Sequence, residues 1–135
     1  MFNITKIKKP YLIAEIGINH NGSVDECKKM IDLSKLAGCD YVKIQKRNPD
    51  VCVPEHQKSK PKSTPWGDMT YLEYKHKIEF NEEQIQELIK YSKSVGIELF
   101  ASVWDIDSVD IMKKLDINKL NGRLTLAFSI SNFLK

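Results

Sequence analysis

The stretch that decides the fold spans residues 12–23 and reads Leu-Ile-Ala-Glu-Ile-Gly-Ile-Asn-His-Asn-Gly-Ser. It predicts a short buried strand over 11–16, a turn rich in glycine and asparagine, and a helix that begins after Ser23. A carboxylate such as that of Glu15 is costly to place on an apolar strand unless something there uses it. Polar groups at the carboxyl end of a parallel strand are where α/β folds place their chemistry, so Glu15 is the first candidate site residue.

The rest of the chain repeats this order of strand and helix. Apolar spacing and capping residues predict helices over 24–36, over 69–78, between Asn81 and Gly96, and from a cap at Asp105 or Asp107 to about Leu115. Strands are predicted over 40–45 and 97–101. Four prolines within 47–67 predict an irregular loop there. The order implies a parallel sheet with right-handed crossovers, which fits both a (β/α)8 barrel and an open doubly wound sheet.

Composition describes an ordinary globular domain of 135 residues, 41% hydrophobic and 29% charged. A formal charge of +3, with lysines spread along the chain, argues against a nucleic-acid partner. No segment approaches the roughly 18 apolar residues that would span a membrane, and residues 1–10 lack the pattern of a signal peptide. Cys27, Cys39 and Cys52 have no metal-ligand spacing and are expected to be free thiols of a cytoplasmic protein.

Polar side chains at the strand ends form the candidate site. Because side chains alternate along a strand, Glu15, Lys43, Gln45 and Ser102 would approach one another from three neighbouring strands. Lys43 could then hold a phosphate or carboxylate, while Glu15 and Gln45 could bind the hydroxyl groups of a polyol. Asn19, in the turn after the first strand, joins Ser102 as a further candidate substrate-binding residue. The competing interpretation is that Glu15 and Lys43 form a structural ion pair.

Three other side chains are expected to have structural roles. His20 is interpreted as a loop histidine that hydrogen-bonds the backbone, since no second ligand stands at a useful spacing for a metal. Trp66 and Trp104 are interpreted as packing residues and not as platforms for stacking a ligand.

The motifs over 13–22, 37–45, 64–74 and 96–105 resemble the sialic acid synthase family in order and spacing. The resemblance implies condensation of phosphoenolpyruvate with N-acetylmannosamine, or with a related aldose or its 6-phosphate, to give a nine-carbon sialic acid. It also implies an α/β fold that is the N-terminal portion of a (β/α)8 TIM barrel, about three βα units of eight. A divalent metal ion, Mn²⁺ or Mg²⁺, and a homodimer with a small C-terminal antifreeze-like domain are implied as well.

Carried over by motif, Lys43 would contact phosphoenolpyruvate, while Glu15 and Gln45 would line the site near the sugar. Glu15 and Lys43 are therefore the candidate catalytic residues. The metal ligands of the family would lie outside this chain. A legionaminate, pseudaminate or other nonulosonate synthase is a related interpretation, because the sugar-selecting loops are mostly absent.

The end of the chain departs from the family pattern. Residues 1–118 are expected to form the partial barrel, whereas 119–135 lack the motif of the fourth strand, and a single-base frameshift near Leu120 would account for that. With open sheet edges and an uncovered face, the isolated chain is expected to be inactive and poorly folded or prone to aggregation. The alternative function is a non-catalytic α/β domain that binds a phosphorylated ligand or a partner chain.

Overall fold

Three parallel strands form the central sheet of the protein. The computed structural model describes residues 10–115, in which β1 (Ile13–Gly17), β2 (Tyr41–Lys46) and β5 (Glu98–Val103) lie side by side in that order. Their register places Glu15 opposite Lys43, and Gln45 opposite Ser102. The predicted parallel α/β arrangement is confirmed, with strand bounds within two residues of those expected.

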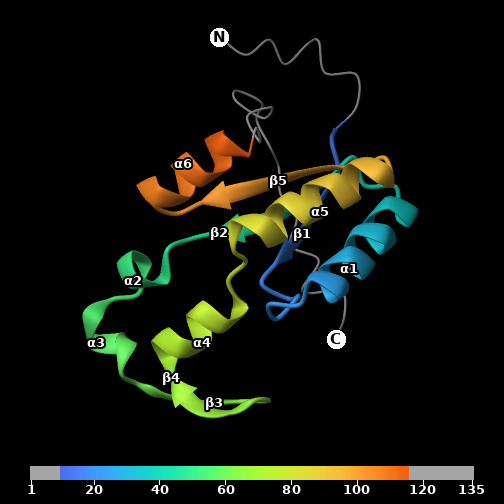
Figure 1. Ribbon diagram of the computed structural model, residues 1–135. Helices are drawn as coiled ribbons and strands as arrows, with labels where there is room; N and C mark the ends of the chain where they lie inside the picture. The colour runs from blue at the N-terminus through green and yellow to red at the C-terminus, as the bar shows by residue number, and fades with distance from the viewer. Residues whose placement is uncertain (1–9, 116–135) are drawn as a thin grey trace.

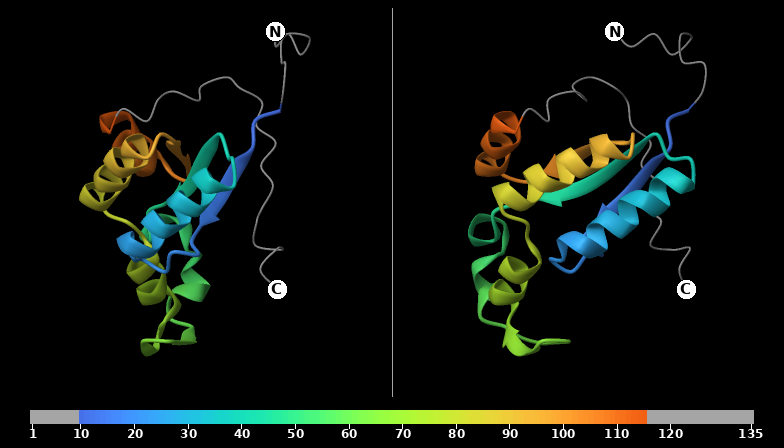
Figure 2. Two further views of the ribbon diagram at one scale, coloured as in Figure 1. Left: turned by 90° about the vertical axis from the view of Figure 1, so that its right-hand side faces the viewer. Right: turned by 45° about the vertical axis from the view of Figure 1, so that its right-hand side comes forward.

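Two long helices, α1 (Val24–Leu36) and α5 (Glu82–Ser94), cover the same face of this sheet (Figures 1 and 2). Both begin at the predicted caps: the Ser23 side chain accepts a hydrogen bond from the Glu26 amide, and Asn81 forms a capping box with Gln84. In neither view of Figure 2 does a helix of residues 10–115 lie over the opposite face. Helices on a single face leave the other face of the sheet free to carry polar side chains.

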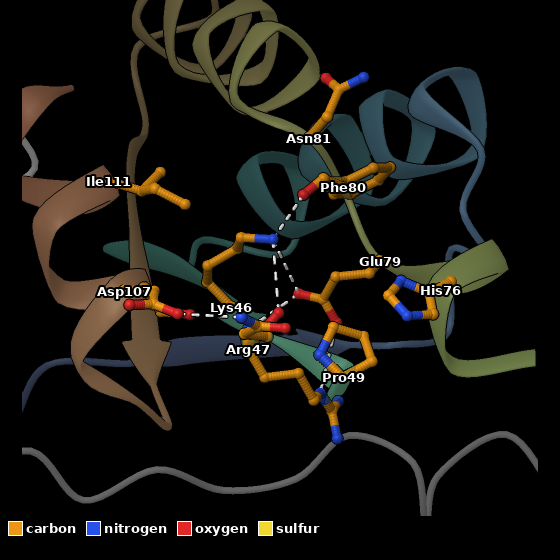
Figure 3. Close-up of a pocket in the computed structure, with 11 residues that line it drawn as sticks. Lys46, Arg47, Pro49, His76, Glu79, Phe80, Asn81, Asp107 and Ile111 are labelled. Carbon is orange, nitrogen blue, oxygen red and sulfur yellow. Dashed lines mark hydrogen bonds and ion pairs between the residues drawn. The ribbon is translucent and has the colours of Figure 1, made fainter. Parts of the chain in front are cut away.

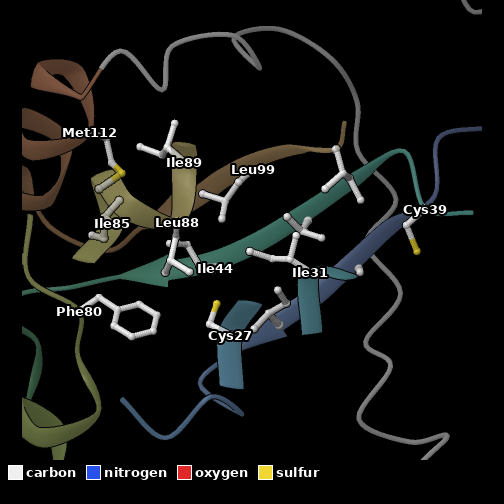
Figure 4. Packing of buried hydrophobic residues seen from close by; sticks show 14 residues of the cluster. Cys27, Ile31, Cys39, Ile44, Phe80, Ile85, Leu88, Ile89, Leu99 and Met112 are labelled. Carbon is white, nitrogen blue, oxygen red and sulfur yellow. The ribbon is translucent and has the colours of Figure 1, made fainter. Parts of the chain in front are cut away.

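The hydrophobic core lies between the sheet and these two helices (Figure 4). Val42 and Ile44 of β2 are fully buried there, together with Ile31 of α1 and Leu88 of α5. Burial of one such side chain contributes about 1.5–3 kcal/mol. Because the strand alternates, burial of Val42 and Ile44 turns Lys43 and its neighbours Tyr41 and Gln45 toward the opposite face, where all three are only partly buried.

The segment between β2 and α5 is where the prediction was wrong, because residues 47–67 are not an irregular loop. The structure has α2 (Pro49–Cys52), α3 (Glu55–Lys58), the antiparallel hairpin β3 (Pro61–Thr64) and β4 (Gly67–Thr70), and α4 (Tyr71–Ile78). Prolines are compatible with the start of a helix and with a two-stranded edge. Pro49 opens α2 after the Asn48 cap, and Pro61 begins β3. The helix predicted over 69–78 starts two residues later, at a capping box of Thr70 and Glu73.

Helix α6 (Ile106–Lys114) follows β5. Its cap is Asp105, one of the two predicted candidates, whose Oδ1 accepts a hydrogen bond from the Ser108 amide at 2.7 Å. Among the helices of residues 10–115, none is long and apolar enough to cross a membrane. The predicted boundary at residue 118 and the frameshift proposed near Leu120 lie outside the described residues.

Candidate functional site

Glu15 and Lys43 form an ion pair between neighbouring strands on the face that α1 and α5 leave uncovered. Their side chains are 14% and 20% exposed, and Lys43 Nζ contacts Oε2 of the carboxylate. The second oxygen, Glu15 Oε1, is buried and has no hydrogen-bond partner among the described residues. A buried acceptor without a partner is costly. Oε1 therefore marks a position where a donor group of a bound molecule would fit.

Gln45 lies two residues farther along β2, on the same face as Lys43. Its Oε1 accepts a hydrogen bond of 2.7 Å from Arg47 Nη2. Gly17 lies between this amide and Glu15: a Cβ added to Gly17 would be 3.5 Å from Glu15 Oε1 and 3.8 Å from Gln45 Nε2. One hydrogen-bond acceptor and one donor thus flank the same point at the end of β1.

The two remaining predicted residues are less closely tied to this pair. Ser102 is in register with Gln45 and partly buried on β5. Asn19 is exposed in the turn after β1, where its amide donates to the Ile16 carbonyl. Within residues 10–115, neither side chain hydrogen-bonds to Glu15, Lys43 or Gln45. The sheet therefore brings Glu15, Lys43, Gln45 and Ser102 to one face, and leaves Asn19 at its rim.

A buried charge cluster that the sequence interpretation missed lies on the helix side of β2 (Figure 3). Lys46 is 7% exposed, and its Nζ donates to the Phe80 carbonyl at 2.8 Å and lies 3.5 Å from Glu79 Oε1. Glu79 Oε1 also accepts the Arg47 amide at 2.9 Å. The signal that could have revealed the cluster is a lysine at a strand position that alternation buries.

A pocket of about 310 Å³ opens beside this cluster, and Figure 3 shows Lys46, Glu79 and Ile111 among the residues that line it. Neither Glu15 nor Lys43 lines the pocket. Lys46 already has a carbonyl and a carboxylate as partners, so its charge is satisfied within the fold. Arg47 lines the pocket and also contacts Gln45, so the pocket adjoins the candidate site.

His20 joins the turn after β1 to the segment that leads into α5. The imidazole is 2% exposed and stacks on Phe80, with ring centroids 3.9 Å apart. Its Nδ1 accepts a hydrogen bond from the Gly22 amide, which confirms the predicted contact with the backbone. Burial lowers the pKa of His20 to about 4, although a backbone hydrogen bond with Gly17 acts in the opposite direction. The ring is therefore neutral near pH 7 and has a structural role in the turn.

Asp105 ties the segment after β2 to the start of α6. Its Oδ2 accepts hydrogen bonds from the Asn48 amide at 2.6 Å and the Ser108 hydroxyl at 2.8 Å. Burial acts to raise the pKa of Asp105, but these hydrogen bonds prevail and hold the pKa below its ordinary value. The carboxylate thus fixes the course of the chain just beyond Gln45 and Arg47.

Trp66 and Trp104, predicted as packing residues, are both largely exposed. Trp104 is 60% exposed because it follows the last residue of β5, and Trp66 is 43% exposed because it lies in the turn of the β3–β4 hairpin. Each ring is instead covered by a cation. The Arg47 guanidinium lies 5.3 Å from the Trp104 centroid, and Lys77 Nζ lies 5.1 Å from that of Trp66.

The described residues do not form a site for the divalent metal ion that the family resemblance implies. Within residues 10–115, no three or more His, Cys, Asp or Glu side chains gather where they could hold a metal. The three cysteines Cys27, Cys39 and Cys52 are free, and burial raises the pKa of the Cys27 thiol to about 12. A protonated buried thiol is a poor metal ligand.

Comparisons with known proteins agree with the motifs. The NeuB family model matches residues 30–121. The N,N'-diacetyllegionaminic acid synthase of Campylobacter jejuni is 32% identical over 113 residues, which cover 82% of this chain and 34% of that protein. Human N-acetylneuraminate-9-phosphate synthase is 36% identical over 109 residues, or 79% of this chain and 30% of that protein.

The fold is also similar to that of a solved structure. The N-acetylneuraminic acid synthetase from Leptospira borgpetersenii superposes with a TM-score of 0.66 at 22% sequence identity, over 81% of this chain and 34% of that one. The chain therefore spans about a third of the length of these relatives.

Proposed function

The chain belongs to the NeuB family, and from this premise we propose that it carries the first part of the active site of a nonulosonate synthase. The reaction would condense phosphoenolpyruvate with N-acetylmannosamine or a related sugar. The observation that carries the proposal is the paired arrangement of Lys43 and Glu15, with the unpartnered Glu15 Oε1 and Gln45 Nε2 both within 4 Å of the point where a Cβ on Gly17 would lie. That arrangement offers a cation for an anionic substrate next to polar groups for a polyol.

We propose further that the sheet is part of a (β/α)8 barrel, of which the chain supplies about three βα units. The support is the sequential strand order β1-β2-β5 with α1 and α5 on one face (Figure 2). Half of a doubly wound sheet would also carry its helices on one face, because the helices change face only where the strand order reverses, so the choice of a barrel rests on the resemblance of the motifs to the family. In the barrel, Glu15, Lys43 and Gln45 would face the interior near the carboxyl ends of the strands, where barrels place their active sites.

In this proposal each side chain has a distinct task. Lys43 would leave Glu15 and bind the carboxylate or phosphate of phosphoenolpyruvate. Glu15 Oε1 would accept a hydrogen bond from a sugar hydroxyl, and Gln45 Nε2 would donate one. These contacts would hold C3 of phosphoenolpyruvate against the aldehyde carbon of the sugar, and loss of phosphate would follow addition of water at C2. The metal ion would require ligands beyond residues 10–115, so no step is assigned to it here.

The sugar substrate and the assembly are also proposals. The relatives include synthases named for legionaminic acid and for N-acetylneuraminate 9-phosphate. We therefore propose a mannose-derived or related amino sugar, phosphorylated or not, as the second substrate, and a homodimer as the assembly of the whole enzyme.

A chimaeric enzyme tests the site. Residues 10–115 would replace the matching segment of human N-acetylneuraminate-9-phosphate synthase, and phosphate release would be measured with phosphoenolpyruvate and each candidate sugar. We expect turnover, and we expect Lys43→Met to raise the KM for phosphoenolpyruvate by about 10- to 100-fold, the effect of a charge-assisted hydrogen bond of about 1.5–3 kcal/mol. The control is Lys29→Met, which removes an exposed lysine paired with Glu26. An active chimaera that Lys43→Met leaves unchanged would contradict the proposal.

The same assay applies to the 135-residue chain on its own. We expect no phosphate release, because three βα units enclose no complete barrel site. Measurable release would show that the chain by itself is an active enzyme. Stabilisation by phosphoenolpyruvate without turnover would favour the alternative of a non-catalytic binding domain.

A further inference from the structure

We propose that Arg47 is a positioning residue that fixes the side-chain amide of Gln45, so that its NH₂ group faces Glu15. The contact itself is a property of the fold. Its consequence for substrate binding rests on the function proposed above.

The orientation follows from the donors and acceptors involved. A guanidinium can only donate hydrogen bonds, so the Gln45 oxygen must be the atom that faces Arg47. The 2.7 Å bond from Arg47 Nη2 to Gln45 Oε1 satisfies this requirement. Gln45 Nε2 is then left at the opposite side of the amide, close to Gly17 and Glu15.

Arg47 is itself held in place from two directions. Its Nε is in an ion pair with Glu79 Oε2 at 3.4 Å but makes no hydrogen bond among the described residues, while its backbone amide donates to Glu79 Oε1 at 2.9 Å. The guanidinium also lies over the Trp104 ring, with 5.3 Å between Cζ and the ring centroid. Figure 3 shows the Lys46 and Arg47 side chains leaving the strand in different directions, although both lie against the Glu79 carboxylate.

The contact between Arg47 and Gln45, here called the clamp, determines what the site can bind. With the amide fixed, the unpartnered acceptor Glu15 Oε1 and the donor Gln45 Nε2 lie 3.5 Å and 3.8 Å from the same point, where a Cβ on Gly17 would stand. A hydroxyl group matches this arrangement, because it can donate to the carboxylate and accept from the amide. A flipped amide would place two acceptors side by side, which a single hydroxyl proton cannot satisfy. Arg47 would thus select a polyol hydroxyl at this point without touching it.

The first test uses the full 135-residue chain and needs no substrate. The sequence has four glutamines, so ¹⁵N labelling of glutamine side chains gives four NH₂ signal pairs, and Gln45→Glu identifies the pair of Gln45. We expect Arg47→Met to shift the Gln45 signals and Arg47→Lys, which keeps one donor, to shift them less. Gln84, whose Oε1 accepts the Asn81 amide, is the internal reference. Gln45 signals that move no more than those of Gln84, or that already coincide with those of an unfolded chain, would overturn the proposal.

The second test measures the consequence in the chimaeric enzyme. We expect Arg47→Met to raise the KM for the sugar about tenfold, as for loss of one hydrogen bond, while the KM for phosphoenolpyruvate stays within about twofold. A rise of both constants by the same factor would indicate a general structural role and would overturn the inference. If the chimaera is inactive while the Gln45 signals still respond to Arg47, the proposed function fails and the positioning contact stands.

Discussion

The ion pair between Glu15 and Lys43 can be tested as a structural and as a functional element in one double-mutant cycle. The three variants are Glu15→Gln, Lys43→Met and the combination of both. Gln and Met keep most of the shape of the original side chains, so the cycle reports mainly on the charges. The functional interpretation predicts that the double variant loses clearly less stability than the sum of the two single variants but does not regain activity.

The expected magnitude follows from how far the pair is buried. Exposed pairs contribute about 0.2–1 kcal/mol, whereas removal of one partner from a fully buried pair costs about 3–5 kcal/mol. The side chains of Glu15 and Lys43 are 14% and 20% exposed, and Oε1 already lacks a partner. We therefore expect Lys43→Met to cost about 3 kcal/mol, Glu15→Gln about 2 kcal/mol, and the double variant only about 2–3 kcal/mol.

The assay is urea unfolding of the chimaeric enzyme at pH 7, followed by far-ultraviolet circular dichroism, because the rest of the barrel there covers the open edges of the sheet. Single-variant effects that add to within about 0.5 kcal/mol in the double variant would refute the pairing. In the chimaeric enzyme, restored turnover in the double variant would show that the pair serves the fold alone.

Two further predictions concern the turn after β1. His20 has a pKa of about 4 in the folded chain and 6.5 in the unfolded chain. Its neutral ring therefore stabilises the fold fully above about pH 6.5, and this stabilisation declines by about 3 kcal/mol as the pH falls toward 4. Urea midpoints at pH 7, 6 and 5 should fall less in His20→Gln than in the exposed control His76→Gln. Gly22 and Gly38 both have positive φ, but only a Cβ on Gly22 would meet a backbone atom, the Lys77 carbonyl oxygen at 2.4 Å. Gly38→Ala should therefore cost about 1 kcal/mol and Gly22→Ala about 3 kcal/mol or more, and equal losses in thermal melts would contradict the close approach.

Local sequence signals predicted the helices and strands of the βα units well. The caps at Ser23 and Asn81 work through atoms within three residues of each other, so they can be read without knowledge of the rest of the fold. Strand alternation likewise placed Glu15, Lys43 and Gln45 on one face, because the period of two is a property of the backbone.

Residues 47–70 show where local signals failed. Prolines in this segment suggested an irregular loop, yet Pro49 starts a helix and Pro61 starts a strand. Proline fixes φ and removes a donor but does not decide between a loop and the first residue of an element. The hairpin and α4 are in contact, and that contact between separate elements selects the regular structure.

The sequence by itself determined which side chains share the candidate site, since backbone periodicity turns Glu15, Lys43 and Gln45 the same way on parallel strands. Only the tertiary structure decided how they are held. The partners of Arg47 are Glu79 and Trp104, 32 and 57 residues away in the chain, and His20 stacks on Phe80, 60 residues away. Such contacts depend on how β2 packs beside β5 and on the path of the chain into α5, and hydrophobic spacing does not encode them. The resulting contact of Arg47 with Gln45 holds the amide oxygen away from Glu15 and would, in the proposed site, give the polar strand ends defined donors and acceptors.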